Sequence, residues 1–466
     1  MNKSTLALAV ALGAIAQQAG AAGFIEDSKA TLGLRNFYIN TDNRDDATKA
    51  AGAQNKSEEW GQAFDLRFIS GYTQGTVGFG LDAIGLLGVR LDSGGGTNGA
   101  TKPSNGNAGS YGGTVFPSKS NGEAVDNYSS LGLTAKAKIS QTELKLGTLQ
   151  PKLPVLVTND GRLLPQTFQG GQITTNDIKD FTLVAGQIEK AKGRNSSNVE
   201  NLSIAGANGR TAAGRDSNKF IYAGGDYKIT KDLTAQYYYG NLDQFYKQHF
   251  LGLLHNWAIG PGVLKTDLRY FNSRSDGNNS NDANYFTSGD YGTNAAGANI
   301  VKGKVDNNLY SGLFLYTVEG HTFGGGYQAS NGNSDFPFLN QGDGASAYLT
   351  TDSQIAKFAR AGERTWQARY AYDFAKIGVP GLTAGVVYLR GDNIDTRGRV
   401  GVAQVQTNSN GASEWERDIT VAYVVPQGPL KNVGVAWKNA MWRNDIAGQR
   451  DQDENRLIVS YSLPLF

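Results

Sequence analysis

The feature that most restricts the fold of this chain is the alternation of apolar and polar residues, seen best in the carboxy-terminal segment RLIVSYSLPLF, Arg456 to Phe466. Val459, Tyr461 and Leu463 alternate with mostly polar neighbours, which is the two-residue period of a β-strand with one apolar face. Similar segments recur along the chain, and after Gly23 no apolar run reaches the roughly 18 residues that a membrane-spanning helix needs. We therefore predict that this segment is the closing strand of a transmembrane β-barrel.

Composition supports one large all-β domain. A length of 466 residues would by itself suggest about three globular domains, yet the texture is uniform from residue 23 to residue 466. Hydrophobic residues make up only 39% of the chain, with 61 Gly and 11 Pro, as expected for many short strands joined by Gly- and Asn-containing turns. We predict a single outer-membrane barrel domain over residues 23–466.

Charge and cysteine content exclude several classes. A net charge of +2 argues against a nucleic-acid-binding protein. The absence of Cys excludes disulfides and thiolate metal sites, and fits a chain that crosses an oxidising compartment. We expect no metal and no cofactor.

The amino-terminus predicts export. Lys3 supplies a positive charge, Leu6 to Ile15 is apolar, and Gly20, Ala21 and Ala22 are small residues suited to cleavage before residue 23. This is the pattern of a secretory signal peptide over residues 1–22, with a buried helix as the alternative. Together with the barrel, it predicts the bacterial outer membrane as the location.

Tight turns and longer polar loops alternate along the chain. We count about eight tight turns and nine loops, hence about 18 strands, an even number with both chain ends on the periplasmic, tight-turn side. One connection differs from the others: Pro151 to Gly171 contains three prolines and the apolar residues Leu153, Val155 and Leu156. An exposed loop does not need these side chains, so we predict that this third loop folds inward against the wall.

The barrel must close, because each unpaired backbone group in hydrocarbon costs several kcal/mol. The last strand should therefore pair with the first. Trp60, Trp366 and Trp415 fall at predicted loop-side strand ends, whereas Trp257 and Phe466 fall at the opposite ends. This distribution predicts two interfacial aromatic girdles, although single Trp residues at strand ends also occur in soluble sandwiches.

Three cations are predicted to face the lumen from one part of the wall. Arg369 shares parity with Gln367, Lys438 lies opposite Trp437, and Arg456 shares parity with serines of the last strand. A row of cations along a narrow pore offers a carboxylate successive weak sites. The alternative is that lumen charges pair with one another and only solvate the wall. Further lumen candidates are Arg35, Arg67, Lys136, Lys138 and Arg269, on faces that also carry Asp65, Glu143 and Asp267.

Two other arginines face the opposite way by simple alternation. Arg390 shares parity with Val386 and Tyr388, and Arg417 shares parity with Ile419, so both belong to the outer face. A β-bulge or a position above the bilayer would be needed to bring either residue inward.

Long segments of the chain resemble the porin D family of substrate-specific outer-membrane channels of Gram-negative bacteria, best known from pseudomonads. The segments are GFIEDSKATLGLRNFYIN, EEWGQAFDLRFISGYTQGTVGFGLDAIGLLGVRLDSG, LGLTAKAKIS, TELKLGTLQPKLPVL, RLLPQTFQGGQ and DENRLIVSYSLPLF. The resemblance spans the mature chain. It implies an 18-stranded monomeric barrel, an inward-folded third loop, and a basic ladder, meaning a row of cations that guides small carboxylate-bearing solutes to the constriction.

Residue by residue, the resemblance implies translocation roles for Arg162, Arg369, Arg390, Arg417 and Lys438, beside Arg456 from the parity argument. The family often has Arg where this chain has Val387 and Ala436, so the ladder should be shorter, and Lys438 offers a point charge in place of a planar fork. Organic or aromatic acids are the favoured solutes, because inward cations outnumber obvious acids near the closing strands. Basic amino acids, and a general non-selective porin, are the alternatives.

Other classes fit less well. Only His249, His255 and His321 could act as general bases, and none lies in a nucleophile-elbow or paired metal-ligand motif, which disfavours a serine hydrolase on a barrel. A plugged adhesin barrel is a further rival. The expected partners are small carboxylate solutes, outer-membrane lipid and lipopolysaccharide, and the barrel-assembly machinery through the last strand. The expected state is a monomer, with a loose trimer as the alternative.

Overall fold

The computed structural model describes residues 23–44, 56–93, 114–119, 124–205, 215–285, 287–293, 299–340, 346–396, 411–446 and 449–466. The predicted signal peptide, residues 1–22, lies outside the described residues. Among the described residues, no helix has both the length and the apolar character needed to cross a membrane.

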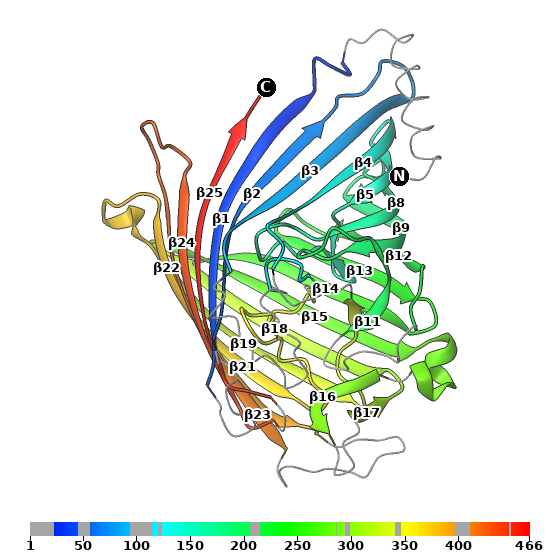
Figure 1. Ribbon diagram of the computed structural model, residues 1–466, viewed down its shortest axis with the longest axis vertical. Helices are drawn as coiled ribbons and strands as arrows, with labels where there is room; N and C mark the ends of the chain where they lie inside the picture. The colour runs from blue at the N-terminus through cyan, green and yellow to red at the C-terminus, as the bar shows by residue number, and fades with distance from the viewer. Residues whose placement is uncertain are drawn as a thin grey trace.

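Eighteen antiparallel strands form a closed wall, as predicted (Figure 1). In chain order they are β1 (Lys29–Asn43), β2 (Lys56–Ile69), β3 (Gly78–Asp92), β4 (Asn127–Ile139), β5 (Thr142–Leu149), β8 (Thr167–Thr175), β9 (Phe181–Lys192), β12 (Phe220–Lys228), β13 (Leu233–Leu242), β14 (Tyr246–Ile259), β15 (Gly262–Ser275), β18 (Asp306–Val318), β19 (His321–Gly332), β21 (Arg364–Asp373), β22 (Leu382–Ile394), β23 (Ala412–Val424), β24 (Gly434–Asn444) and β25 (Gln452–Pro464). Each strand pairs with its sequence neighbours in the wall.

Short elements belong to the connections. The two-residue β10 (Glu200–Asn201) extends the edge of β9, β6 (Lys152–Leu153) pairs with β7 (Leu156–Val157), β11 (Ser203–Ala205) pairs with β20 (Phe338–Asn340), and β16 (Thr287–Thr293) pairs with β17 (Asn299–Gly303). The described loops and turns also contain the short 3₁₀ helices η1 (Gly277–Ser280), η2 (Ala283–Tyr285) and η3 (Phe374–Ile377).

The barrel closes through the pair β1 and β25, drawn in blue and red side by side in Figure 1. Leu32 lies opposite Leu463 and Leu34 opposite Tyr461, which is the predicted pairing of the first and last strands. The Ala30 N–H donates to the Phe466 carbonyl over 3.2 Å, so the ladder continues to the last residue. No edge of the wall is left for lipid, as hydrogen bonding in hydrocarbon requires.

The two faces of the wall differ as the alternation predicts. Leu457, Val459 and Leu463 of β25 are exposed on the outside, whereas Glu454 on the inward face of the same strand is buried. Outer side chains are apolar because the solvent they meet is the bilayer. Trp60 and Trp366 are exposed near the loop-side ends of their strands, as the predicted loop-side girdle requires.

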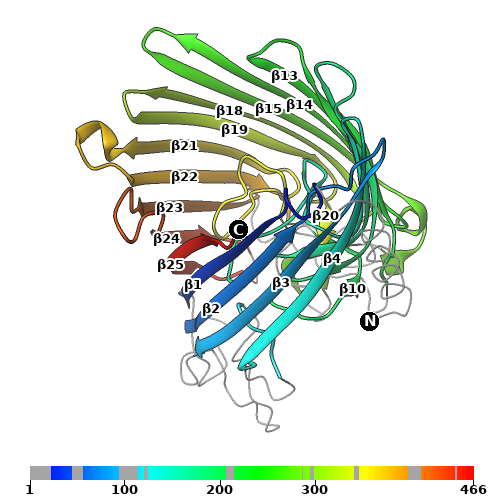
Figure 2. The same cartoon turned by 90° about the horizontal axis from the view of Figure 1, so that it is seen from above.

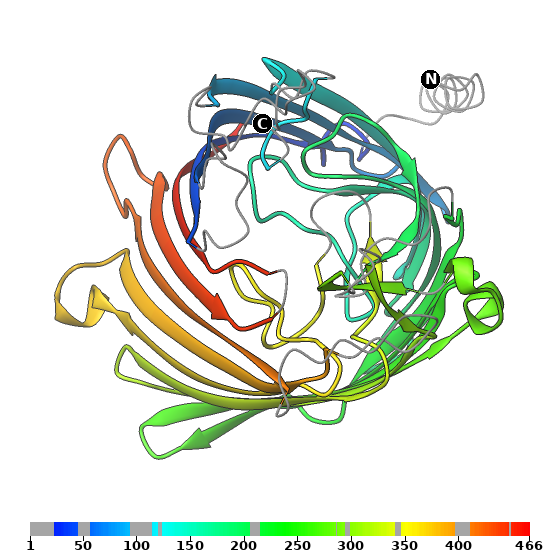
Figure 3. The same ribbon diagram turned by 60° about the horizontal axis from the view of Figure 1, so that its bottom comes forward.

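The chain ends lie on the tight-turn side. The Gly71 N–H, in the turn between β2 and β3, donates to the Phe24 carbonyl over 2.9 Å. Between β4 and β5 the predicted turn is tight, and Ser140 adopts a left-handed conformation with φ 53°. The long connections therefore all leave from the other end of the barrel, where Figure 2 and Figure 3 show described loops lying inside the ring of strands.

An apolar core lies inside the barrel on one side. Phe220, Phe250 and Phe271 point inward from β12, β14 and β15 and are fully buried, while Leu251, next to Phe250, is half exposed on the outside. Loop residues such as Phe336 pack against them. This core fills the part of the lumen next to β8–β18.

Candidate functional site

The third loop folds into the barrel, as predicted. Val155 and Leu156 belong to the apolar core beside β8–β18, whereas Leu163 and Leu164 pack in a second buried cluster with Phe37 of β1. Both ends of the segment are thus anchored by burial, at opposite sides of the lumen. Residues 158–162 join these two buried clusters.

Arg35 fixes the tip of the third loop to the wall. Its Nη1 donates to Asp160 Oδ1 over 2.7 Å and to the Arg162 carbonyl over 2.6 Å, and its Nη2 donates to Asp160 Oδ2 over 3.1 Å. A bidentate guanidinium–carboxylate pair sets both distance and orientation. Arg35 therefore faces the lumen, as predicted, and positions the loop.

A second inward segment, residues 346–361, faces the third loop. Ser346 forms an isolated β-bridge with Val157. Arg369 Nη2 donates to the Thr350 carbonyl over 2.5 Å, and Arg269 Nη1 donates to the Tyr348 carbonyl over 3.1 Å. The alternation does not predict this segment, but its apolar residues, Leu349 and Phe358 among them, carry the same signal as those of the third loop.

Two carboxylates of β23 bind the backbone of the second segment. Glu416, fully buried, accepts the N–H groups of Ile355 and Ala356 over 2.8 and 2.7 Å, and Asp418 accepts the Gln354 N–H over 3.3 Å. A carboxylate that accepts two backbone N–H groups satisfies donors that an inward loop cannot offer to water. These acids share an inward parity that the alternation could have revealed.

Arg456 contacts both inward segments. Its Nε donates to Glu454 Oε1 over 2.6 Å, its Nη1 donates to the Gly161 carbonyl over 3.3 Å, and its Nη2 donates to the Gln354 carbonyl over 3.0 Å. The side chain is 11% exposed and that of Glu454 is 6% exposed. The predicted inward orientation is confirmed, and the residue joins the two loops.

A cavity of about 620 Å³ lies between the two segments and the closing strands. Four cations and three acids line it: Arg162, Arg194, Lys357 and Arg456, with Asp160, Asp352 and Glu454. Each acid forms an ion pair, with Arg35, Lys357 and Arg456 respectively. A second cavity of about 290 Å³ lies on the turn side of the third loop, bordered by Arg35, Asp65, Ser460 and Ser462. Both cavities border residues of β25 and β1.

The other predicted cations divide between the two faces. Arg369 and Lys438 face the lumen, and Lys438 lies next to Arg456 in the register of β24 and β25. Gly324 of β19 lies beside Arg369, where an added Cβ would come within 2.9 Å of the arginine Cβ, so Gly leaves room for it. Among the described residues, Lys438 forms no hydrogen bond or ion pair.

Arg390 and Arg417 lie on the outer face, and the lumen positions that the resemblance implies for them are wrong. In β22, Leu389 and Gly391 are buried inside while Arg390 pairs with Asp392 over 3.1 Å on the outside. In β23, Arg417 lies between the inward residues Glu416 and Asp418. The pairing of β22 with β23 shifts register between Gly391 and Ile394, beyond Arg390, and the pairing of β23 with β24 is regular throughout, so the alternation is not reversed at these positions.

The charge balance of the closing strands also differs from expectation. Glu414, Glu416, Asp418 and Glu454 face inward, so inward cations do not outnumber acids there. Near this cluster, burial raises the pKa of the Glu363 carboxyl well above its usual range, and the neighbouring Glu414 adds to the effect. Glu363 precedes β21, outside the membrane-spanning strands.

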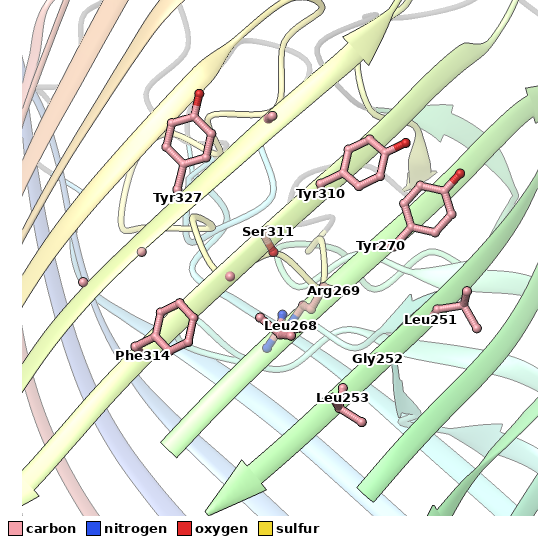
Figure 4. Close-up of a pocket in the computed structure, with 14 residues that line it drawn as sticks. Leu251, Gly252, Leu253, Leu268, Arg269, Tyr270, Tyr310, Ser311, Phe314 and Tyr327 are labelled. Carbon is pink, nitrogen blue, oxygen red and sulfur yellow. The ribbon is translucent and has the colours of Figure 1, made fainter. Parts of the chain in front are cut away.

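A further cavity, of about 760 Å³, is not in the lumen (Figure 4). It is an apolar groove on the outer wall, over β14, β15, β18 and β19. Outward residues with exposed side chains, including Leu251, Tyr310, Phe314 and Tyr327, surround small residues such as Gly325. The groove faces the bilayer and lies outside the solute path.

A closed barrel with an apolar outer wall and a lumen narrowed by two inward loops defines a transmembrane channel of the outer-membrane type. A family model described as "outer membrane porin, OprD family" matches residues 22–465. The chain belongs to this family, whose members are porins and not enzymes, and its location is the bacterial outer membrane.

Relatives from two pseudomonads agree. The chain is 35% identical over 462 residues to the porin-like protein GalP of Pseudomonas putida, covering 99% of this chain and 97% of the relative. It is 33% identical to porin D of Pseudomonas aeruginosa, covering 100% and 99%.

Solved structures from Pseudomonas aeruginosa share the fold. OccK8 (OprE) is 60% identical with a TM-score of 0.81, covering 95% of this chain and 100% of the other. OpdK, solved with vanillate, is 34% identical with a TM-score of 0.77, again covering 95% and 100%. The chain is therefore a substrate-specific porin of this family.

Proposed function

We propose that this porin takes up small carboxylate-bearing solutes, organic or aromatic acids, by passive diffusion along the β25–β1 seam. The observation that carries the proposal is the cavity between the two inward segments, where the side chains of Arg162, Arg194, Lys357 and Arg456 gather. Guanidinium groups bind carboxylates through paired, charge-assisted hydrogen bonds. Because the three acids of the cavity already accept from cations, they repel an incoming anion less than bare carboxylates would.

Lys438 supplies the next site. It faces the lumen beside Arg456, on the row nearer the turn side than Glu454. A solute carboxylate leaving the cavity can exchange hydrated contacts with this ammonium, which is a compact point charge and holds an anion less rigidly than a guanidinium fork. Binding that is attractive but weak at successive sites is what conduction requires.

The vanillate in the OpdK structure supports the aromatic-acid class, since vanillate is an aromatic carboxylate. A second candidate is a channel for basic amino acids, favoured by the inward acids Glu414, Glu416, Asp418 and Glu454. Most of these acids, however, accept hydrogen bonds from loop backbone or from neighbouring side chains. Of these four acids, Glu454 alone lines the cavity of about 620 Å³, beside four cations.

Planar-bilayer recordings test the proposal. Benzoate, its uncharged alcohol analogue and arginine are added to single channels of the wild type, Lys438→Gln, Arg162→Gln and the outward-facing control Arg390→Gln. We expect benzoate to interrupt the wild-type current, and the interruption to weaken in the first two variants but not in the control. Interruption by arginine and not by benzoate would favour the basic amino acids. Equal effects of all three solutes would indicate a non-selective porin.

A further inference from the structure

Arg417 lies on the lipid-facing side of the wall, in the loop-side half of β23. Its outward neighbours on the same strand are Trp415 toward the loops and Ile419 and Val421 toward the turns. Trp415 stacks on Tyr388 of β22 at 5.8 Å and 25°. Arg417 therefore lies just inside the loop-side aromatic girdle, where an outward cation costs less than the about 2–4 kcal/mol it costs at the bilayer midplane.

The contacts of Arg417 are neutral. Its Nη2 donates to Asn439 Oδ1 of β24, and Asn439 Nδ2 donates to Asn455 Oδ1 of β25 over 3.0 Å. Within the part of the chain that the structure describes, no carboxylate forms an ion pair with Arg417. The outward arginines on either side differ: Arg390 pairs with Asp392 over 3.1 Å, and Arg443 pairs with Asp453 over 2.7 Å.

The surrounding surface favours an anionic headgroup. Arg390, Trp415 and Arg443 lie side by side in the register of β22, β23 and β24, and the Arg443 guanidinium lies 6.0 Å from the centre of the Trp415 ring. Aromatic rings at this depth lie at the headgroup level of a membrane, and clustered arginines there attract anionic lipid. Among the described residues of this surface, Arg417 is the cation that forms no ion pair with a carboxylate.

We propose that Arg417, with Asn439 and the flanking arginines Arg390 and Arg443, binds a phosphate of an outer-leaflet glycolipid, that is, the phosphorylated headgroup of lipopolysaccharide. A planar guanidinium forms two parallel hydrogen bonds to phosphate oxygens, and the acyl chains of the lipid would lie along Ile419 and Val421 below it. The proposal concerns the outside of the barrel and holds whichever solute passes through the lumen.

A second copy of the chain is a less fitting occupant. Two copies that docked through this same patch would bring Arg417 toward Arg417, because a two-fold interface places identical surfaces together. Like charges without an intervening anion would oppose that contact. A lipid phosphate satisfies the same cation without requiring a complementary protein surface.

Refolded, lipopolysaccharide-free protein in detergent provides the test. Native mass spectrometry measures retention of bisphosphorylated lipid A, dephosphorylated lipid A and a zwitterionic phospholipid by the wild type, Arg417→Gln, Arg417→Lys and the lumen control Lys438→Gln. We expect bisphosphorylated lipid A to bind the wild type and Lys438→Gln alike. Its apparent affinity should fall about tenfold in Arg417→Gln, as for one lost charge-assisted hydrogen bond, and less in Arg417→Lys.

Single-channel conductance of Arg417→Gln should equal that of the wild type, which also shows that the variant folds. Unchanged retention of bisphosphorylated lipid A in Arg417→Gln would overturn the proposal. So would equal retention of the phosphorylated and dephosphorylated lipids by the wild type. A change in oligomeric state without a change in lipid retention would assign the patch to a second copy instead.

Discussion

Replacing Arg456 with Gln should loosen both segments that narrow the lumen, because this one side chain contacts each of them. The wild-type guanidinium donates to the Gly161 carbonyl of the third loop and to the Gln354 carbonyl of the second segment. A hydrogen bond from a charged donor contributes about 1.5–3 kcal/mol. Taking the lower figure, each segment loses about 1.5 kcal/mol of attachment, so its detached population rises roughly tenfold.

The substitution also leaves Glu454 without its cation. The carboxylate is 6% exposed, and removing one partner of a buried pair costs about 3–5 kcal/mol when nothing replaces it. Gln keeps a donor for one of the three contacts, so the loss of attachment should be partial. The barrel wall, held by its strand pairing, should remain folded.

Single-channel noise and hydrogen exchange measure the loosening. Arg456→Gln should show larger current fluctuations and faster amide exchange in residues 158–162 and 352–356. The matched control is Arg67→Gln, which removes the same charge from the lumen, but Arg67 pairs with Asp65 over 2.8 Å on its own strand. If the two variants show equal noise and equal exchange, Arg456 does not hold the segments and the reasoning is wrong.

Three further perturbations test the wall and its loop-side end. Burial raises the pKa of the Glu363 carboxyl, so the stability that this residue contributes is complete below its pKa of about 4.3 in the unfolded chain and is lost as pH rises through its pKa in the folded protein. Thermal melts should therefore show that stability falls with rising pH, and Glu363→Gln should reduce this dependence on pH. In a urea titration, Gly147→Ala should lower the free energy of unfolding by about 3 kcal/mol, because Gly147 has φ 131° and an added Cβ would come within 2.1 Å of the Leu133 carbonyl oxygen. The control Gly325→Ala, whose added Cβ would have no atom within 4 Å, should leave that free energy unchanged. Val459→Arg should cost about 2–4 kcal/mol in vesicle-refolding measurements, because Val459 faces lipid, whereas Ser460→Arg on the lumen side of the same strand should fold normally; equal costs would contradict the assignment of the two faces.

Alternation placed most wall residues correctly. Arg369, Lys438 and Arg456 were assigned to the lumen and Arg390 and Arg417 to the outside by parity alone, and the strand register agrees. The resemblance implied lumen positions for the last two, and it failed there because similarity of a segment does not report which way one side chain points. A period of two has no such ambiguity unless a bulge intervenes.

The alternation predicts which way the acids of the closing strands point, but not what they bind. Parity puts Glu416 and Asp418 inside, but a charge count treats them as neutralising partners of the cations. In the structure they accept backbone N–H groups of residues 354–356, so their role depends on a loop more than fifty residues earlier in the chain. Neither the sequence around Glu416 and Asp418 nor that of residues 354–356 predicts this contact.

The sequence by itself determined the barrel, its strand number and the closing pair of β1 and β25. This was possible because the bilayer imposes two requirements: outward side chains must be apolar, and every backbone N–H and C=O group must be hydrogen-bonded. In a β-barrel the first requirement produces an alternation with a period of two along each strand, and the second requires the sheet to close. The tertiary structure alone decided the contacts that hold the two inward segments in place. Arg456 meets Gly161 across 295 positions of sequence, and Arg369 meets Thr350 only because residues 346–361 fold inward. Such contacts depend on how loops pack inside the closed wall, and that packing involves burial and charge of many residues far apart in the chain. The alternation of apolar and polar residues along one strand therefore does not predict them.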